Sequence, residues 1–439
     1  MSQLTAEQYR EQLESARRHP ALAEDNINLP AGSGAALSRV LIGLGVVGLA
    51  LTLLGAFVVN VKHALAAYQV GVMSVLAIAL GSLFFIMIFH LVNAGWHATI
   101  KRQWEHLFSM LPLCVLLVLP VLVIEVVRAV LAGPNNEVHG ALLFEWLNPA
   151  LAGTFLIDHK AGYLNAPFWL IRFALYAAIW IFLAQRLYSL SKQQDLTGDR
   201  WLTQKARFMS GWGTLALALT TSFAAFDWMM SMDYRFFSTM WGVYYFAGSA
   251  GASVAALVIV LAVLRGLGRL TGAVTDQHFR DLGKFLFAFS VFWAYIGFGQ
   301  YFLIWYANIP EETAYYLRRS TGGWEGLSVL LVLGHFVVPF VLLLFKPVKH
   351  STLGLALVAG WLILMHTLDM VWIIRPMVYI ADWAAFDPGP AGWWLDIAAG
   401  VGVFALFAGV LVRKIASGPL VGTKDPYIGE ALKHKNYVG

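Results

Sequence analysis

Cysteine and charge are the two features in which this sequence is poorest. Cys114 is the single cysteine and lies in an apolar segment, which excludes a disulfide framework and a cysteine-rich zinc site within the chain. Charged residues make up 13% of the 439 residues, against about 25% in soluble globular domains. The net charge of +5 is modest and no basic stretch is dense, so we expect no nucleic-acid partner. We also expect no signal peptide, because the first apolar run begins near Leu37 and is too long for one.

Long hydrophobic runs dominate the rest of the chain, in which 59% of the residues are hydrophobic. Ten of these runs have at least the ~20 residues that a helix needs to cross the hydrocarbon core of a bilayer. We therefore predict an all-α integral membrane protein with ten transmembrane helices. The predicted spans are 37–60, 68–94, 106–131, 166–190, 208–230, 239–264, 284–306, 325–345, 351–373 and 394–413.

Lysine and arginine predict the orientation of these spans. Most of the 30 basic residues lie in the N-terminal segment, the even-numbered loops and the C-terminal tail. Because cytoplasmic loops are enriched in Lys and Arg, we predict that both termini are cytoplasmic. The predicted organisation is a cytoplasmic N-terminal segment (1–35) with a short helix, a ten-helix membrane domain (36–414) and an extended cytoplasmic C-terminal tail (415–439).

Ionisable residues within the spans are the candidate functional residues, because such groups are costly inside a membrane. His366 and Asp369 are three residues apart and therefore share one helix face in the outer third of the ninth span. An imidazole beside a carboxylate can accept a proton near neutral pH, although the pair can also simply hold two helices together. Glu125 and Asp227 lie in the outer parts of the third and fifth spans. Each has a structural alternative, because Glu125 can pair with Arg128 on its own helix and Asp227 can be solvated.

The seventh span supplies candidate ligand contacts. Gln300 and Tyr301 lie in its outer third, Trp305 lies at its boundary, and Arg375 lies just past the end of the ninth span. Aromatic residues at the interface usually form a belt, but they can also stack against a flat aromatic ligand. Tyr301 lies deep enough for such a ligand contact.

Two histidines lie deeper in the membrane. His335 is in the middle of the eighth span and His90 is in the inner part of the second, whereas His97 is expected at the cytoplasmic surface. With His366 and Asp369, the first two make a sparse polar series across the membrane, which is the minimum that a proton path requires. A packing role for His335 and a haem bound between His90 and His335 are the alternatives.

Two segments resemble a known protein family. They are FDWMMSMDYRFFSTMWGVYYFAGS (226–249) and DLGKFLFAFSVFWAYIGFGQYFLIWYANIPEET (281–313). Both are similar to NrfD-type polysulfide-reductase membrane subunits, most closely to the ActF-type subunits, which are the shorter of two such subunits in alternative complex III. The ten spans and the cytoplasmic termini agree with this family, so the resemblance covers nearly the whole chain.

The resemblance implies two four-helix bundles, spans 2–5 and 6–9, flanked by spans 1 and 10, in a bacterial inner membrane. It also implies a hetero-oligomeric complex with an iron–sulfur subunit, multihaem cytochrome c subunits and a second NrfD-like subunit, surrounded by lipid. Such complexes oxidise menaquinol or a related quinol, and the partner subunits carry the iron–sulfur clusters and haem c. This chain is expected to bind no metal or other cofactor of its own.

The predicted function is that of a non-haem membrane subunit of a quinol:electron-acceptor (cytochrome c) oxidoreductase, not an enzyme alone. The residues expected to contact quinol are Gln300, Tyr301, Trp305 and Arg375. The residues expected to accept or conduct protons are His366, Asp369, Glu125, Asp227, His335 and His90. The alternatives are a structural membrane anchor without chemistry of its own and a secondary transporter.

Overall fold

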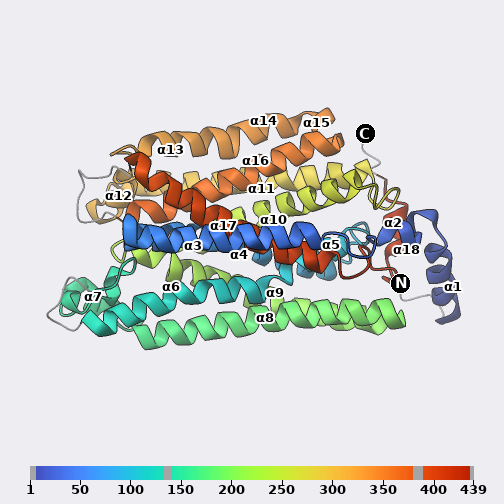
Figure 1. Cartoon of the computed structure of the whole chain (residues 1–439), viewed down its shortest axis with the longest axis horizontal. Helices are drawn as coiled ribbons and strands as arrows, with labels where there is room; N and C mark the ends of the chain where they lie inside the picture. The colour runs from blue at the N-terminus through green and yellow to red at the C-terminus, as the bar shows by residue number, and fades with distance from the viewer. Residues whose placement is uncertain (1–5, 133–139, 379–388, 436–439) are drawn as a thin grey trace.

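The computed structural model of the protein describes residues 6–132, 140–378 and 389–435. Within these ranges ten helices are long and apolar enough to cross a membrane, as predicted, and no strand is present. The protein is therefore an all-α, multi-pass integral membrane protein. The long helices run along one common axis, and both termini lie at the same end of the molecule (Figure 1). We call this the terminal end and the opposite end the far end.

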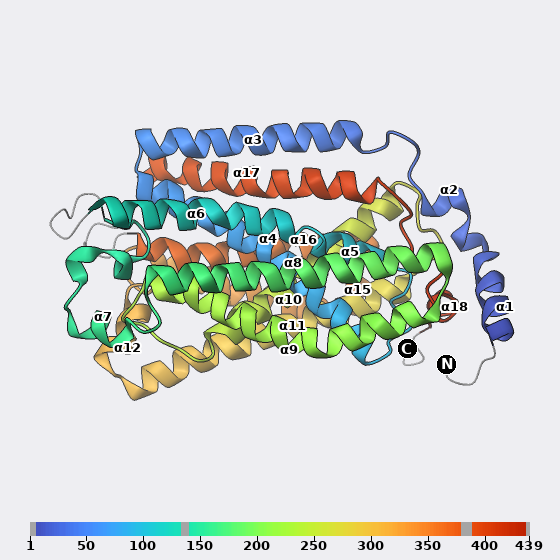
Figure 2. The ribbon, with the colours of Figure 1, turned by 90° about the horizontal axis from the view of Figure 1, so that it is seen from below.

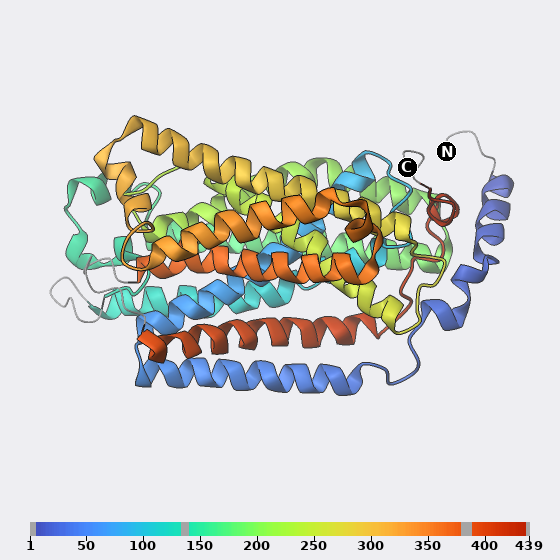
Figure 3. The same cartoon turned by 90° about the horizontal axis from the view of Figure 1, so that it is seen from above.

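The spans form two bundles and a flanking pair, as expected. The first bundle contains α4 (Val61–Leu91), α5 (Lys101–Phe108) followed by α6 (Leu111–Ala132), α8 (Ala166–Thr197) and α9 (Arg200–Trp228). The second contains α10 (Trp241–Gly266), α11 (Asp276–Ala307), the segment α13 (Trp324–Leu331), η6 (Val332–Val337) and α14 (Val338–Leu344), and α16 (Thr352–Ile374). The flanking helices α3 (Ala35–Val58) and α17 (Gly389–Ile415) lie side by side along one edge (Figure 3).

Short helices cover the two ends of the bundles. At the terminal end are α1 (Ala6–Arg17), η1 (Pro20–Leu22), α2 (Glu24–Ile27), α15 (Lys346–His350) and α18 (Ile428–Leu432). At the far end are η3 (Glu145–Leu147), η4 (Pro149–Leu151), α7 (Phe155–Lys160), η5 (Met230–Met232), α12 (Pro310–Leu317) and η7 (Arg375–Met377). Helix α1 lies across the terminal end instead of along the spans (Figure 2).

The helix boundaries follow from local sequence. The Asn60 side chain accepts hydrogen bonds from the backbone N–H groups of Lys62 (2.8 Å) and His63 (3.2 Å), so α4 begins earlier than the hydrophobic run predicts. Gly198 has a φ of +71°, a left-handed conformation that glycine adopts without steric cost, and it ends α8. The Asp199 side chain then accepts a hydrogen bond from the Trp201 N–H and starts α9.

Small residues allow the spans to pack closely. A side chain at Gly48 would come within 2.6 Å of the Gly402 Cα, so α3 and α17 require glycine at their crossing. A side chain at Gly81 would come within 2.2 Å of the Ser249 carbonyl oxygen, so α4 and α10 approach equally closely. Close backbone approach at small residues is a main source of helix association in membranes. Helix α4 consequently lies at the centre of the molecule, with nearly all of its side chains buried.

The eighth span contains one wide π-helical turn, η6. Pro339 follows it and has no N–H to offer the His335 carbonyl, so the regular hydrogen-bond ladder is interrupted. The Trp361 indole N–H instead donates a 2.7 Å hydrogen bond to the Gly334 carbonyl within this turn. The wide turn places His335 among the buried side chains of the second bundle.

Candidate functional site

A cavity of about 710 Å³ lies in the far half of the second bundle. It is bounded by α10, α11, α12, α13 with η6, and α16. Its wall is mostly apolar and rich in aromatic rings. The aromatic residues that line it include Trp241, Tyr244, Trp293, Tyr301, Tyr316 and Trp372. A concave, mainly apolar site with a few polar groups is the usual form of a small-molecule site.

The cavity opens sideways through the outer surface of the bundle. Tyr295 and Phe298 of α11 line it and are 69% and 65% exposed, and Val329 and Val332 of the eighth span are each 57% exposed. These side chains lie along membrane-spanning helices, so the opening faces the lipid. A ligand that is dissolved in the bilayer can therefore enter between α11 and the eighth span.

Asp369 is the buried carboxylate beside this cavity and is only 1% exposed. It accepts a 2.5 Å hydrogen bond from the Tyr244 hydroxyl and a 3.0 Å hydrogen bond from the Trp293 indole N–H. Both donors line the cavity, whereas Asp369 itself lies behind them. The tyrosine hydroxyl is thus placed to pass a proton between a ligand and the carboxylate.

His366 and His335 lie next to this carboxylate cluster. His366 shares the α16 face of Asp369, and a side chain at Gly248 of α10 would come within 3.0 Å of its Nδ1 atom. Neither ring nitrogen of His366 has a hydrogen-bond partner within the described part of the chain. The His335 ring stacks on Trp293 with 3.9 Å between ring centres. Trp293 therefore contacts both His335 and Asp369, and it joins these two predicted polar residues into one cluster.

Arg319 provides the positive charge at the far end of the cavity. Its guanidinium donates hydrogen bonds to the carbonyl oxygens of Trp372 (2.9 Å) and Ile373 (2.7 Å), which end α16. It also lies 3.4 Å above the centre of the Tyr315 ring. Burial lowers the pKa of Arg319 below its usual value. A cation at a helix C-terminus is favourable, so Arg319 both fixes the end of α16 and lines the cavity.

The predicted ligand contacts divide into two groups. Gln300 and Tyr301 line the cavity, and the Gln300 side-chain oxygen accepts a 2.7 Å hydrogen bond from the Ser238 hydroxyl. Trp305 is 61% exposed on α11 and is not among the residues of the cavity wall, which fits its alternative as a belt residue. Arg375 is buried away from the cavity, where its Nε lies 2.8 Å from the Asp396 carboxylate of α17.

The structure places Asp227 in a separate, fully buried ion pair in the first bundle. The Arg172 guanidinium donates to both carboxylate oxygens at 2.7 and 2.8 Å, and the Tyr176 hydroxyl donates at 2.9 Å. Arg172 also lies 3.8 Å above the Tyr163 ring. Asp227 is therefore not solvated, and this bidentate pair joins α8 to α9.

Glu125 anchors the segment that follows the third span at the far end. Its two carboxylate oxygens accept 2.9 Å hydrogen bonds from the backbone N–H groups of Leu142 and Leu143. Arg128 donates a 3.1 Å hydrogen bond to the Gly140 carbonyl. The described contacts of both residues thus fasten the same loop segment, which gives Glu125 a structural role.

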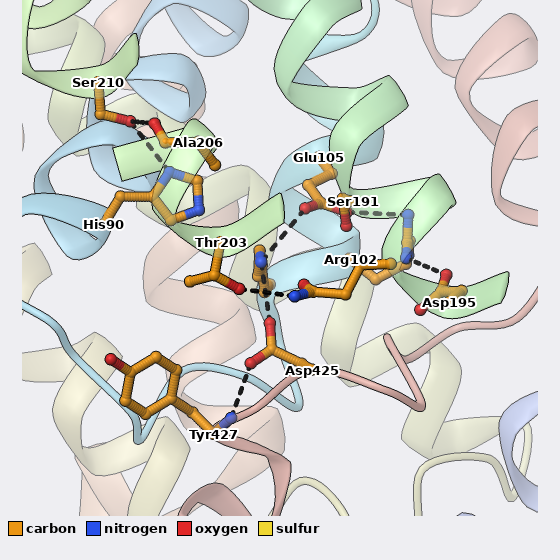
Figure 4. A network of polar contacts seen from close by, with 12 residues as sticks. His90, Arg102, Glu105, Ser191, Asp195, Thr203, Ala206, Ser210, Asp425 and Tyr427 are labelled. Carbon is orange, nitrogen blue, oxygen red and sulfur yellow. Dashed lines mark hydrogen bonds and ion pairs between the residues drawn. The ribbon is translucent and has the colours of Figure 1, made fainter. Parts of the chain in front are cut away.

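Sequence reasoning missed a polar network at the terminal end (Figure 4). The Lys101 ammonium lies 2.9 Å from Asp425 and 3.9 Å from Glu105, and Arg102 pairs with Glu105 (2.9 Å) and with Asp195. The sequence signal was present, because the basic residues and Glu105 are spaced three and four residues apart on one short helix. The network could not be predicted from this helix alone, because Lys101 pairs with Asp425 of the C-terminal tail, 324 positions later in the chain.

The two deeper histidines have separate surroundings. The His90 Nδ1 lies 3.0 Å from the Ser210 hydroxyl of α9, and His335 lies in the second bundle. His97 is buried instead of lying at the surface as predicted, because the loop that carries it folds back under the tail. Among the described residues no group of three His, Cys, Asp or Glu side chains is arranged to hold a metal ion.

Serine hydroxyls lie between the cavity cluster and the terminal end. The hydroxyls of Ser82 (α4) and Ser253 (α10) are 2.9 Å apart, and the Trp104 indole N–H donates to Ser253 at 3.3 Å. Gly248, which contacts His366, precedes Ser253 by five residues, or about 7.5 Å along the helix axis. Helix α10 therefore carries polar groups from the cavity cluster towards α5.

Comparison with protein-family models and with curated proteins finds no match for this chain.

Proposed function

We propose that this chain is a non-haem membrane subunit of a quinol:electron-acceptor oxidoreductase complex, and that its cavity binds the quinol. One observation carries the proposal. The aromatic cavity opens to lipid, and two residues of its wall, Tyr244 and Trp293, donate hydrogen bonds to Asp369, which lies behind them. A quinol has matching properties, since its flat ring stacks on aromatic side chains, its apolar tail dissolves in the bilayer, and its hydroxyls lose protons on oxidation.

The proposed chemistry at this site is proton transfer. Oxidation of a quinol to a quinone releases two protons and two electrons. Tyr244 would pass a ligand proton to Asp369, while the electrons would leave to an iron–sulfur subunit at the far end, which is then the outer side of the bacterial inner membrane. This chain supplies binding, orientation and proton acceptance, and the redox centres belong to the proposed partner subunits.

The polar groups along α10 support a proton path as the second part of the proposal. His366 lies against Gly248, and the hydroxyls of Ser253 and Ser82 continue the series towards Trp104 and the terminal end. Waters would have to complete this series. In this assignment the terminal end is cytoplasmic, in agreement with the concentration of lysine and arginine there.

The test is to fill the cavity without touching the proton-transfer residues. Ala294 lines the cavity on α11, so Ala294→Trp in the assembled complex should lower quinol:acceptor activity about tenfold or more. Leu303→Trp is the matched control, because Leu303 is on the same helix, is 64% exposed and is not in the cavity wall. Normal activity of both assembled variants would place quinol oxidation in another subunit.

The alternatives predict different results. A structural anchor predicts that His366→Ala and Asp369→Asn change the stability of the complex but not its turnover per assembled complex. A secondary transporter predicts activity of the isolated chain in proteoliposomes, without any partner subunit.

A further inference from the structure

The terminal-end network places several charged side chains on one buried helix. All eight residues of α5 are buried, and they include Lys101, Arg102 and Glu105. The Ser191 hydroxyl donates a further 2.9 Å hydrogen bond to Glu105. Burying several charges next to one another costs free energy even when they are paired, so this cluster is a candidate functional site.

Two histidines beside this network have ring nitrogens without partners. His97 is 4% exposed, and neither of its ring nitrogens has a hydrogen-bond partner of good geometry within residues 6–132, 140–378 and 389–435, beside a weaker backbone interaction with Ala94. The His90 Nε2 likewise has no hydrogen-bond partner among the described residues, although the Nδ1 of the same ring contacts Ser210. Because buried polar atoms are nearly always hydrogen-bonded to protein or water, these nitrogens indicate a site that binds water or a proton.

The C-terminal segment 418–435 covers this site. It is not extended as predicted but folds back onto the chain, where the Gln103 amide donates a 2.7 Å hydrogen bond to the Leu420 carbonyl. Leu420 in turn donates its N–H to the Ile27 carbonyl at 2.7 Å. The Tyr427 hydroxyl lies 3.3 Å from the Asn93 side chain, in the loop that carries His97.

Asp425 is the central contact of this cover. It comes from a polar terminal segment, yet it is only 6% exposed and lies 2.9 Å from the Lys101 ammonium. The Tyr427 N–H donates a 2.9 Å hydrogen bond to the same carboxylate and fixes its orientation (Figure 4). The segment cannot leave α5 without breaking this ion pair.

We propose that Lys101, Glu105 and His97 form a second proton-exchange site, and that residues 418–435 are its removable cover, held closed by Asp425. When the segment lifts, water reaches α5 from the terminal end and the site exchanges protons with that side. When it is closed, the site is sealed. The further transfer of a proton to Asp369 rests on the proposed function, but the existence of the cover does not.

The experiment measures deuterium exchange at the C2 carbon of histidine rings in the full-length chain within its complex. His97 should exchange slowly in the wild type, whereas exposed His159 serves as the fast internal reference. Asp425→Asn keeps the shape of the side chain and removes the charge that holds Lys101. We expect about tenfold faster exchange at His97, because local opening becomes more frequent.

The matched control is Lys433→Gln, which removes an exposed charge in the same segment and should leave His97 exchange unchanged. Amide exchange of Leu142 and Leu143 at the far end reports whether the rest of the fold is intact. If Asp425→Asn disturbs these amides, Lys101→Gln provides the same test from the other side of the ion pair.

Fast exchange at His97 in the wild type, or slow exchange in an intact variant that lacks the ion pair, would overturn the proposal. If this chain proved not to bind quinol, the expected exchange rates at His97 would stay the same. Asp369→Asn should change turnover without changing exchange at His97, so the two proposals fail separately.

Discussion

The Tyr244 hydroxyl lies 2.5 Å from the Asp369 carboxylate, and the Tyr244 side chain lines the cavity, so this residue links the cavity wall to a carboxylate that lies behind it. Asp369 comes from α16, Tyr244 from α10 and the second donor, Trp293, from α11. Three of the four spans of the second bundle therefore converge on one carboxylate. This convergence is the basis of the proton-acceptor assignment.

Asp369→Asn should lower turnover per assembled complex about a hundredfold, because the amide keeps the size of the side chain but cannot accept the proton. Tyr244→Phe should also lower turnover, because it removes the hydroxyl that donates to Asp369. Steady-state quinol oxidation by the purified complex, normalised to assembled subunit, measures both. Asp233→Asn is the control, since Asp233 pairs with Arg318 at 3.1 Å and is not in the cavity wall. Unchanged turnover of Asp369→Asn would remove Asp369 from the mechanism.

Arg172→Ala should destabilise the protein by about 3–5 kcal/mol, because it leaves the buried Asp227 carboxylate without its cation. Thermal unfolding in detergent measures the change. The double variant Arg172→Met with Asp227→Leu should recover much of the loss, since it removes both charges. A double variant that is less stable than Arg172→Ala would show that Asp227 does more than join α8 to α9.

Glu125→Gln should loosen the far-end segment that begins at Gly140. The amide accepts fewer and weaker hydrogen bonds from the Leu142 and Leu143 N–H groups, a loss of about 1.5–3 kcal/mol. Amide hydrogen exchange at these two positions should become correspondingly faster. The nearby Glu145→Gln is the control. If turnover falls while the two amides remain protected, Glu125 has the proton-conducting role that the sequence suggested.

Acid should favour opening of the C-terminal cover through His97. Burial first, and then the Lys101 ammonium, lower the pKa of His97 to about 3; Asp425 and a backbone interaction with Ala94 oppose this shift, and His278 adds to it. The closed state therefore binds a proton on His97 less tightly than the open state, in which the pKa is near 6.5. The closed state is fully favoured above about pH 6.5 and loses stability as the pH falls from there through 3.

The expected change is up to about tenfold in the opening equilibrium for each pH unit below about 6.5. Amide exchange of residues 418–435 between pH 5 and 7, corrected for intrinsic rates, measures it. Asp425 does not add to the effect in this range: although burial alone would raise its pKa, the Lys101 ammonium lowers it below 3.8. His97→Gln should abolish the pH dependence, and its persistence in that variant would contradict the assignment.

The spans were predictable because each hydrophobic run is long enough to cross a membrane on its own. The ends of the helices were harder to predict, because capping residues such as Asn60 extend a helix beyond its apolar run. The helical spacing of His366 and Asp369 correctly placed both on one face of α16. It could not show that Asp369 bonds to α10 and α11 while His366 packs against Gly248, because these partners come from distant segments.

The terminal-end network was unpredictable for the same reason. Lys101 and Glu105 are recognisable as a charged turn of helix, but a charged turn next to a span normally lies in solvent. Only the return of the tail brings Asp425 over Lys101 and buries His97 beneath it. Likewise, Asp227 can be assigned to a structural ion pair only when Arg172 on the preceding span is seen to face it.

The most direct measurement is a cryo-EM map of the intact complex with a quinol-site inhibitor bound. Our account predicts inhibitor density in the cavity between α11 and the eighth span, with its ring beside Trp293 and a polar group at the Tyr244 hydroxyl. Inhibitor density confined to a partner subunit would contradict it and would leave this chain with proton conduction or anchoring alone.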